Sequence, residues 1–219
     1  MNNLVFLEPN CIKAVPFTTS DIIAERTNNS YRSIQRTIEN QINRLEKFGI
    51  VRFEITVSGK AGRPKKVYQL NEQQATLLIT FLKNNDIVAD FKTELVRQFY
   101  EMRSELQKRQ IGKEQLKPTR RTLTDEIRDN PEHNKWDFKL YTDLAYKMVT
   151  GKVAVQLRKE RGASKTAVAI DYMTSDEIAQ VEKLVYKIAV LYEMGLSYYQ
   201  IKGMLANRKM LKETACKGA

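Results

Sequence analysis

The segment TTSDIIAERTNNSYRSIQRTIENQINRLEKFGIVRFEITVSGKAGRPKKVYQL, residues 18–70, decides the fold expected for the N-terminal part of this chain. Its first residues supply several helix N-caps, and a short helix is expected to stop near Thr27. Asn28, Asn29 and Ser30 predict a tight turn, because Asn tolerates left-handed backbone and Ser can cap a following helix. A second helix is predicted over residues 31–48, since isoleucines and leucine recur at three- and four-residue steps before Gly49.

The spacing of the apolar residues changes from three or four to two after this second helix. Apolar and polar residues alternate from Val51 to Val57, which is typical of a strand. A Gly-rich turn follows over residues 58–66, and residues 67–70 are expected to return as the partner strand. Two helices followed by a two-stranded ribbon is the order of a winged helix-turn-helix.

A short edge strand is expected at residues 4–7, and the chain after the ribbon predicts helices. Helices are expected at 72–83 and 86–110, and then at 119–129, 138–150, 152–161, 175–194 and 197–207. Residues 111–118 suggest a linker, because Gly112 and Pro118 disfavour helix. The expected class is therefore α+β. A winged-helix domain at 1–110 would be followed by the linker, an all-helical domain at 119–207 and a basic tail at 208–219.

The second helix carries the residues expected to read DNA. In a helix-turn-helix protein the first turns of the second helix reach base edges in the major groove. Arg pairs with guanine and Gln with adenine through two hydrogen bonds each, so these residue types suit direct readout. A plain amphipathic helix with a solvated polar face is the alternative. The candidates on this helix and at its cap are Ser30, Tyr31, Arg32, Gln35, Arg36 and Glu39.

The tip of the ribbon is strongly basic. Lys60, Arg63, Lys65 and Lys66 lie within seven residues of one another, without an acidic residue among them. The sequence 62–64, Gly-Arg-Pro, also matches the core of an AT-hook, which inserts Arg into a narrow minor groove. We expect this tip to contact the minor groove or phosphates; the alternative is a solubilising hairpin.

A third basic cluster lies in the C-terminal half. It offers a second nucleic-acid surface or a docking face for an acidic partner, and an ordinary solvated helix is the alternative. Its members are Lys152, Arg158, Lys159, Arg161 and Lys165.

The amino-acid composition indicates which classes of function to expect of this chain. The chain of 219 residues has 37 Lys and Arg against 26 Asp and Glu, a formal net charge of +11, which predicts attraction to nucleic acid or an anionic surface. No apolar run approaches the length of a membrane span, and no signal peptide is expected, so a cytoplasmic, nucleoid-associated protein of a bacterial host is expected.

Two cysteines and one histidine do not predict a disulfide framework, a metal site or a cofactor. No nucleophile motif, P-loop or dinucleotide fingerprint is present, so an enzyme is not expected.

The N-terminal region resembles the phage Rha family of regulatory proteins. The likeness rests on TTSDIIAERTNNSYRSI (18–34), FGIVRFE (48–54), LNEQQATLLITFLKNN (70–85) and VADFKTELVRQFYEMR (88–103). The C-terminal half is similar to the helical domains of phage antirepressors, through residues 147–162 and 196–205. The resemblance implies a prophage-encoded transcriptional regulator with a winged helix.

Three functional hypotheses follow. The first is a sequence-specific regulator that binds double-stranded DNA, as a homodimer in the usual manner of helix-turn-helix proteins. The second is an antirepressor that binds a repressor or a host regulatory protein. The third is a phage or plasmid replication initiator, which would bind tandem repeats instead of a promoter palindrome.

Overall fold

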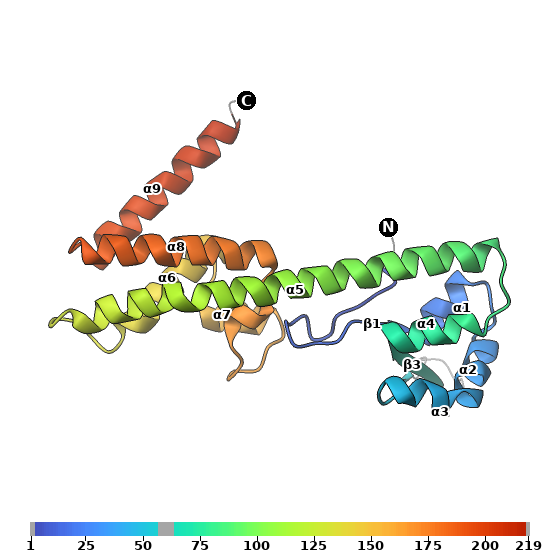
Figure 1. Cartoon of the computed structure of the whole chain (residues 1–219). Helices are drawn as coiled ribbons and strands as arrows, with labels where there is room; N and C mark the ends of the chain where they lie inside the picture. The colour runs from blue at the N-terminus through green and yellow to red at the C-terminus, as the bar shows by residue number, and fades with distance from the viewer. Residues whose placement is uncertain (1–2, 57–63, 218–219) are drawn as a thin grey trace. The chain divides into compact units, whose positions relative to one another are not determined.

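A computed structural model describes residues 3–56 and 64–217 of the chain, with only the helical backbone described from residue 208 onward. The contacts divide it into two compact units (Figure 1). The first contains residues 1–8 and 13–104, and the second contains residues 9–12 and 105–219. The expected α+β class is confirmed, with one small sheet in the first unit and helices throughout the second.

The sheet of the first unit is antiparallel and has the strand order β1-β3-β2. Strands β2 (Arg52–Thr56) and β3 (Lys65–Asn71) are the expected ribbon, and Phe53 lies opposite Tyr68. Strand β1 (Phe17–Thr19) was not expected, because its threonines predict a helix cap. They serve both roles: Thr18 pairs with Leu70 and Thr19 is the N-cap residue of the next helix. The described edge of the sheet beyond β2 has no partner strand.

Helices α1 (Ser20–Arg26) and α2 (Tyr31–Asn40) confirm the two expected helices and the turn between them. The second helix is shorter than its apolar stripe predicts. The backbone bends at Gln41, with φ −110° and ψ 11°, before α3 (Ile42–Leu45) and the 3₁₀ turn η1 (Glu46–Phe48). The bend divides the stripe, so that Ile38 and Leu45 are both buried although they lie on different helices.

Helix α4 (Glu72–Thr80) begins with a capping box that also holds the turn into β2. The Asn71 side chain accepts from the Gln74 N–H, and the Gln74 side chain accepts from the Asn71 N–H. Gln74 is 1% exposed, and its amide donates to the Gly49 carbonyl at 2.7 Å. Gly49 has φ +115°, which favours glycine. One amide therefore fixes both the start of α4 and the entry into β2.

Helix α5 (Asp86–Asp129) corrects the expected linker. Residues 111–118 are helical, and α5 is drawn in Figure 1 as one uninterrupted helix. Gly112 does not break it: a Cβ at this position would lie 3.0 Å from the Ile178 methyl Cγ2, so glycine permits close packing there. Pro118 lies inside the helix with its ring exposed. The division by contacts falls between Ser104 and Glu105, and the domain bounds expected from the sequence stay predictions.

The second unit packs α6 (Asp137–Thr150), α7 (Ala154–Glu160), the 3₁₀ turn η2 (Ala169–Tyr172), α8 (Ser175–Glu193) and the first turns of α9 (Tyr198–Lys217) around the C-terminal part of α5. The backbone of α9 continues through most of the expected tail, whose side chains lie outside the described part. Within residues 3–56 and 64–217, no helix combines the length and apolar character needed to cross a bilayer.

Candidate nucleic-acid interface

The turn between α1 and α2 is held by its own polar side chains. Asn28 adopts the left-handed conformation, with φ +52°. The Asn29 amide donates to the Thr27 hydroxyl at 2.9 Å, and the Thr27 hydroxyl donates to the Ile23 carbonyl at 2.5 Å. Ser30 caps α2 by accepting from the Ser33 N–H at 3.1 Å. Ser30 therefore has a structural role besides the DNA contact expected of it.

The exposed face of α2 carries the strongest candidates for reading bases. Ile34 and Ile38 are fully buried beneath it and fix the orientation of the helix. Arg32 and Arg36 are exposed on the opposite side, and neither makes an ion pair with any acidic residue in the described part of the chain. Two guanidinium groups without acidic partners remain available to an anionic ligand.

Two other candidates on α2 are engaged with the sheet. The Tyr31 hydroxyl donates to the Lys66 carbonyl, and the Tyr68 hydroxyl donates to a Glu39 carboxylate oxygen at 3.1 Å. Partial burial raises the pKa of Tyr31 above its ordinary value, so the phenol stays protonated at neutral pH. These contacts join α2 to β3, so the helix and the ribbon are held as one assembly.

Four residues of the ribbon were expected to contact DNA. Lys60 and Arg63 lie outside the described residues. The ammonium of Lys65 lies 4.1 Å from the centre of the Tyr31 ring, and that of Lys66 lies 4.0 Å from the centre of the Phe53 ring. These cation–π contacts hold the Lys65 ammonium close to α2 and the Lys66 ammonium against the ribbon, without neutralising their charge.

Three further basic residues in this unit were not among the candidates. Arg44 and Lys47 follow the bend at Gln41 and are exposed on α3 and η1, and Arg52 is exposed at the start of β2. In a single helix over residues 31–48, Arg44 and Lys47 would lie at the C-terminal end, away from the turns that reach base edges. The sequence does not predict the bend at Gln41, so it does not indicate these two residues as candidates.

The third basic cluster is largely used in holding the second unit together. Arg161 forms a two-pronged ion pair with Glu177, at 2.7 and 2.5 Å, and also donates to the Tyr172 carbonyl at 2.5 Å. Lys152 pairs with Glu160, and Arg158 donates to the Ala167 carbonyl at 3.5 Å. Lys159 and Lys165 are exposed. A second nucleic-acid surface there stays a prediction, with Arg161 committed to the fold.

The second unit also contains a buried polar cluster. Arg109 is 6% exposed and donates to Glu105 at 2.9 Å and to Asn10 at 2.8 Å. Glu105 accepts in addition from the N–H and the hydroxyl of Ser175. Burial opposes ionisation of Glu105, but the hydrogen bonds from Arg109 and Ser175 lower its pKa below the ordinary value. The Glu105 carboxylate accepts its hydrogen bonds from Arg109 and Ser175 of the same unit, which indicates a structural role for this cluster.

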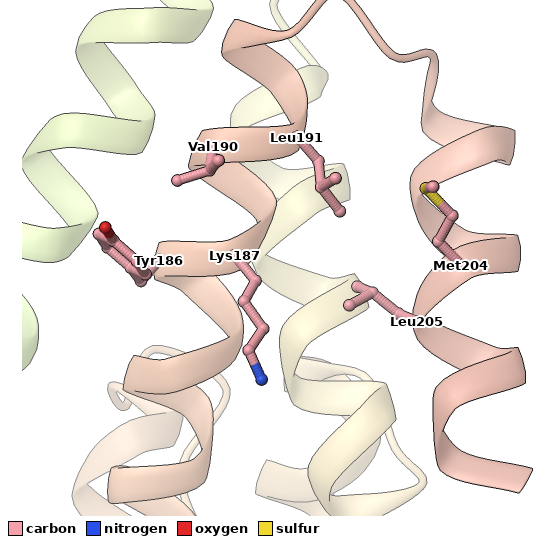
Figure 2. A pocket seen from close by; sticks show the side chains of 6 residues that line it. All are labelled: Tyr186, Lys187, Val190, Leu191, Met204 and Leu205. Carbon is pink, nitrogen blue, oxygen red and sulfur yellow. The ribbon is translucent and has the colours of Figure 1, made fainter. Parts of the chain in front are cut away.

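An open apolar groove lies between α8 and α9 (Figure 2). It has a volume of about 280 Å³. Leu191 and Leu205 extend into the space between the two helices, and Tyr186, Val190 and Met204 are exposed beside it. Lys187 is the charged residue of its lining. The groove is shallow and apolar, which suits a hydrophobic side chain of a partner better than a polar substrate.

The described part of the chain contains no group of three or more His, Cys, Asp or Glu residues placed to hold a metal ion. Cys11 is free.

The comparison with protein families supports the resemblance seen in the sequence. Residues 18–104 match the model of the family described as phage regulatory protein Rha. The match covers about two fifths of the chain and includes α1, α2, the sheet, α4 and the first part of α5. Residues 18–104 are therefore similar to the domain of phage regulatory protein Rha. No curated protein gives a significant match to the chain.

Proposed function

We propose that this chain is a sequence-specific DNA-binding regulator of phage or prophage type, with α1 and α2 as a helix-turn-helix and β2–β3 as its wing. The exposed arginines of α2 carry the proposal. Arg32 and Arg36 lie on the face opposite Ile34 and Ile38, and no acidic residue in the described ranges neutralises them. The family match to a phage regulatory protein supports the same role.

The contacts between α2 and β3 support a shared DNA surface. The Tyr31 hydroxyl bonds to the Lys66 carbonyl, and the Lys65 ammonium lies over the Tyr31 ring. An α2 placed in the major groove would thus bring the base of the ribbon to the neighbouring backbone. Lys65 and Lys66 would contact phosphates there, and Lys60 and Arg63 would extend the contact into the minor groove.

The remaining polar residues of α2 divide by role in this proposal. Arg36 and Gln35 read base edges, with Arg32 beside them. Ser30, Tyr31 and Glu39 chiefly orient the helix, because each already bonds within the fold. Any contact that they make to DNA would come through their remaining polar atoms.

The regulator acts as a homodimer and without catalysis. One helix-turn-helix module reads a single half-site, so two-fold dimers are the usual solution for high specificity. Such a protein would act on the nucleoid in the cytoplasm of the bacterial host. Neither the family match nor the polar clusters offer a catalytic group or a cofactor site to argue for an enzyme.

Selection of duplexes from a random pool tests the proposal with three proteins: the wild type, Arg36→Ala and Arg121→Ala. Arg121 is an exposed arginine of α5 and gives the same loss of charge away from α2. Arg36→Ala is expected to weaken binding to the best site by about 1–3 kcal/mol and to relax preference at one base pair. Arg121→Ala should leave the motif unchanged. If Arg36→Ala keeps the wild-type motif and affinity, α2 does not read bases through Arg36.

A second candidate is a protein-binding function of antirepressor type, and the groove between α8 and α9 favours it. Tyr186 and Met204 border the groove, are 61% and 55% exposed, and offer an apolar surface to an amphipathic helix. This function would not require the arginines of α2. A repressor that co-purifies in stoichiometric amount, and is lost with Val190→Asp but not with Arg36→Ala, would support it.

A further inference from the structure

The outer edge of β2 is an exposed apolar feature of the first unit. Ile50, Ile55 and Phe53 are 83%, 64% and 48% exposed, and every residue of β2 is exposed. The alternating pattern predicts a strand buried on one face, but among its described residues, 50–56, only Val51 is buried, just before β2. A two-sided exposed edge strand presents unpaired backbone groups and is a template for pairing with another strand.

The charges on β2 identify the strand that fits this edge. Arg52 and Glu54 lie on one face, and Phe53 and Ile55 lie on the other, as their opposite partners on β3 show. A second copy of β2 can run antiparallel beside the first about a two-fold axis. If this axis passes through Phe53, each Arg52 lies opposite Glu54 of the other copy. Phe53 then lies opposite Phe53, and Val51 lies opposite Ile55.

Neighbouring registers do not match in this way. An axis through Arg52 places two arginines opposite each other, and an axis through Glu54 places two glutamates opposite each other. Like charges that face each other directly across strands are destabilising, whereas opposite charges and aromatic pairs stabilise. Among these three registers, only the one centred on Phe53 satisfies both faces of the strand.

We propose that two copies of this chain pair through β2 in the register centred on Phe53, which joins the two sheets into one. The interface is isologous, because the same strand serves both partners. Exposed Phe48 and Ile50, which precede β2, add apolar surface at its ends. This proposal supplies a dimer surface for the proposed regulator, but the pairing requires no DNA. It is therefore measured on the free protein, so its failure is distinguishable from failure of DNA binding.

Charge reversal tests the register on the full chain. Arg52→Glu and Glu54→Arg each place like charges opposite each other twice, and each is expected to raise the dimer dissociation constant about tenfold in sedimentation experiments. The double variant restores two opposite-charge pairs and should recover the wild-type constant. Both variants at position 54 lose the hydrogen bond from Gln69 to Glu54, so recovery in the double variant isolates the intermolecular pair.

A cross-link tests the two-fold axis directly. Phe53→Cys, in a background with Cys11→Ser and Cys216→Ser, should form an intermolecular disulfide, because directly opposed strand residues lie within disulfide range. Val155→Cys is the control, since Val155 is 54% exposed on α7 of the second unit. A monomeric wild type, a dimer indifferent to the charge reversals, or equal cross-linking at positions 53 and 155 would each overturn the proposal.

Discussion

The buried amide of Gln74 connects three backbone segments of the first unit. It accepts from the Asn71 N–H at 3.0 Å, and it donates to the carbonyls of Gly49 and Leu45 at 2.7 and 3.4 Å. The turn at Gly49 precedes β2, so this side chain helps to fix the backbone that enters the strand. In the sequence the Asn-Glu-Gln-Gln run indicates only a helix N-terminus, because the bonds to residues 45 and 49 are long-range.

Gln74→Leu is expected to lower the free energy of unfolding by about 1–3 kcal/mol, because the Gly49 carbonyl and the Asn71 N–H lose their partner. Gln73→Leu is the matched control, since Gln73 is the exposed neighbour on the same helix. Denaturant unfolding of both variants measures the difference. Equal stability of the two variants would show that the buried amide does not hold the turn.

The ion pair between Glu177 and Arg161 makes stability depend on pH. Burial opposes ionisation of Glu177, but the Arg161 guanidinium and the Thr174 backbone N–H together hold the pKa of that carboxyl below its ordinary value. A lowered folded-state pKa contributes stability above the unfolded-state pKa, about 4.3 for Glu, and loses it as pH falls through the folded-state value.

Glu177→Gln should therefore be less stable than the wild type at pH 7, and the difference should shrink as pH falls below about 4.3. Thermal unfolding between neutral and acidic pH measures this. Glu193→Gln, an exposed carboxyl at the end of the same helix, is the control and should lower the unfolding temperature much less. A difference that stays constant with pH would mean that the pair contributes nothing through ionisation.

Among the elements, α5 shows best why sequence patterns misjudge a helix. Gly112 and Pro118 are statistical helix breakers, and together they predict a linker. In the structure Gly112 allows close approach to Ile178 of α8, and Pro118 sits on the exposed side of α5. The breaker rule measures the cost of a residue in an isolated helix, whereas contacts with other helices decide the outcome here.

Gly112→Val is expected to destabilise the protein by about 1–3 kcal/mol, because the added atoms would crowd Ile178. The same substitution at Gly203 of α9 is the control, since a Cβ there meets no atom within 4 Å. Intrinsic helix propensity favours valine over glycine at both sites. Thermal unfolding should thus show opposite signs for the two variants, and a stabilised Gly112→Val would contradict close packing at this position.

The ribbon and α2 show what the local pattern does predict. The period of two correctly predicts the ribbon, and the Asn-Asn-Ser turn correctly predicts the left-handed backbone at Asn28 and the N-cap at Ser30. The pattern could not predict that Phe53 and Ile55 remain exposed, because burial depends on which helices cover the strand. It also could not predict the bend at Gln41, since the apolar stripe continues through it.

For the whole molecule, the surplus of positive charge acts at a distance as well as at individual contacts. A net charge of +11 favours association with any duplex, and each phosphate contact adds to the salt dependence of binding. The sequence predicts this non-specific attraction well, because net charge follows from the amino-acid composition alone. Which arginines are available depends on the fold, as Arg161 in its ion pair and unpaired Arg36 demonstrate.

Neutralising Lys65 and Lys66 together by substitution with Gln is expected to weaken binding to all duplexes alike and to reduce the salt slope by about 0.9 per lost phosphate contact. Titrations of one specific and one random duplex at several salt concentrations measure both effects. Lys183→Gln with Lys202→Gln is the control, because it removes the same charge from exposed positions of the second unit that lie outside the third basic cluster. If the control pair has the larger effect on the slope, the ribbon is not the phosphate-binding element.

Selection of bound duplexes from the encoding genome, at a low and a physiological salt concentration, shows whether α2 reads DNA sequence. We expect one enriched motif, built of two half-sites related by two-fold symmetry, that persists at both salt concentrations. Binding that disappears at physiological salt without an enriched motif would contradict it, and would leave the chain as a basic protein whose α2 does not read sequence.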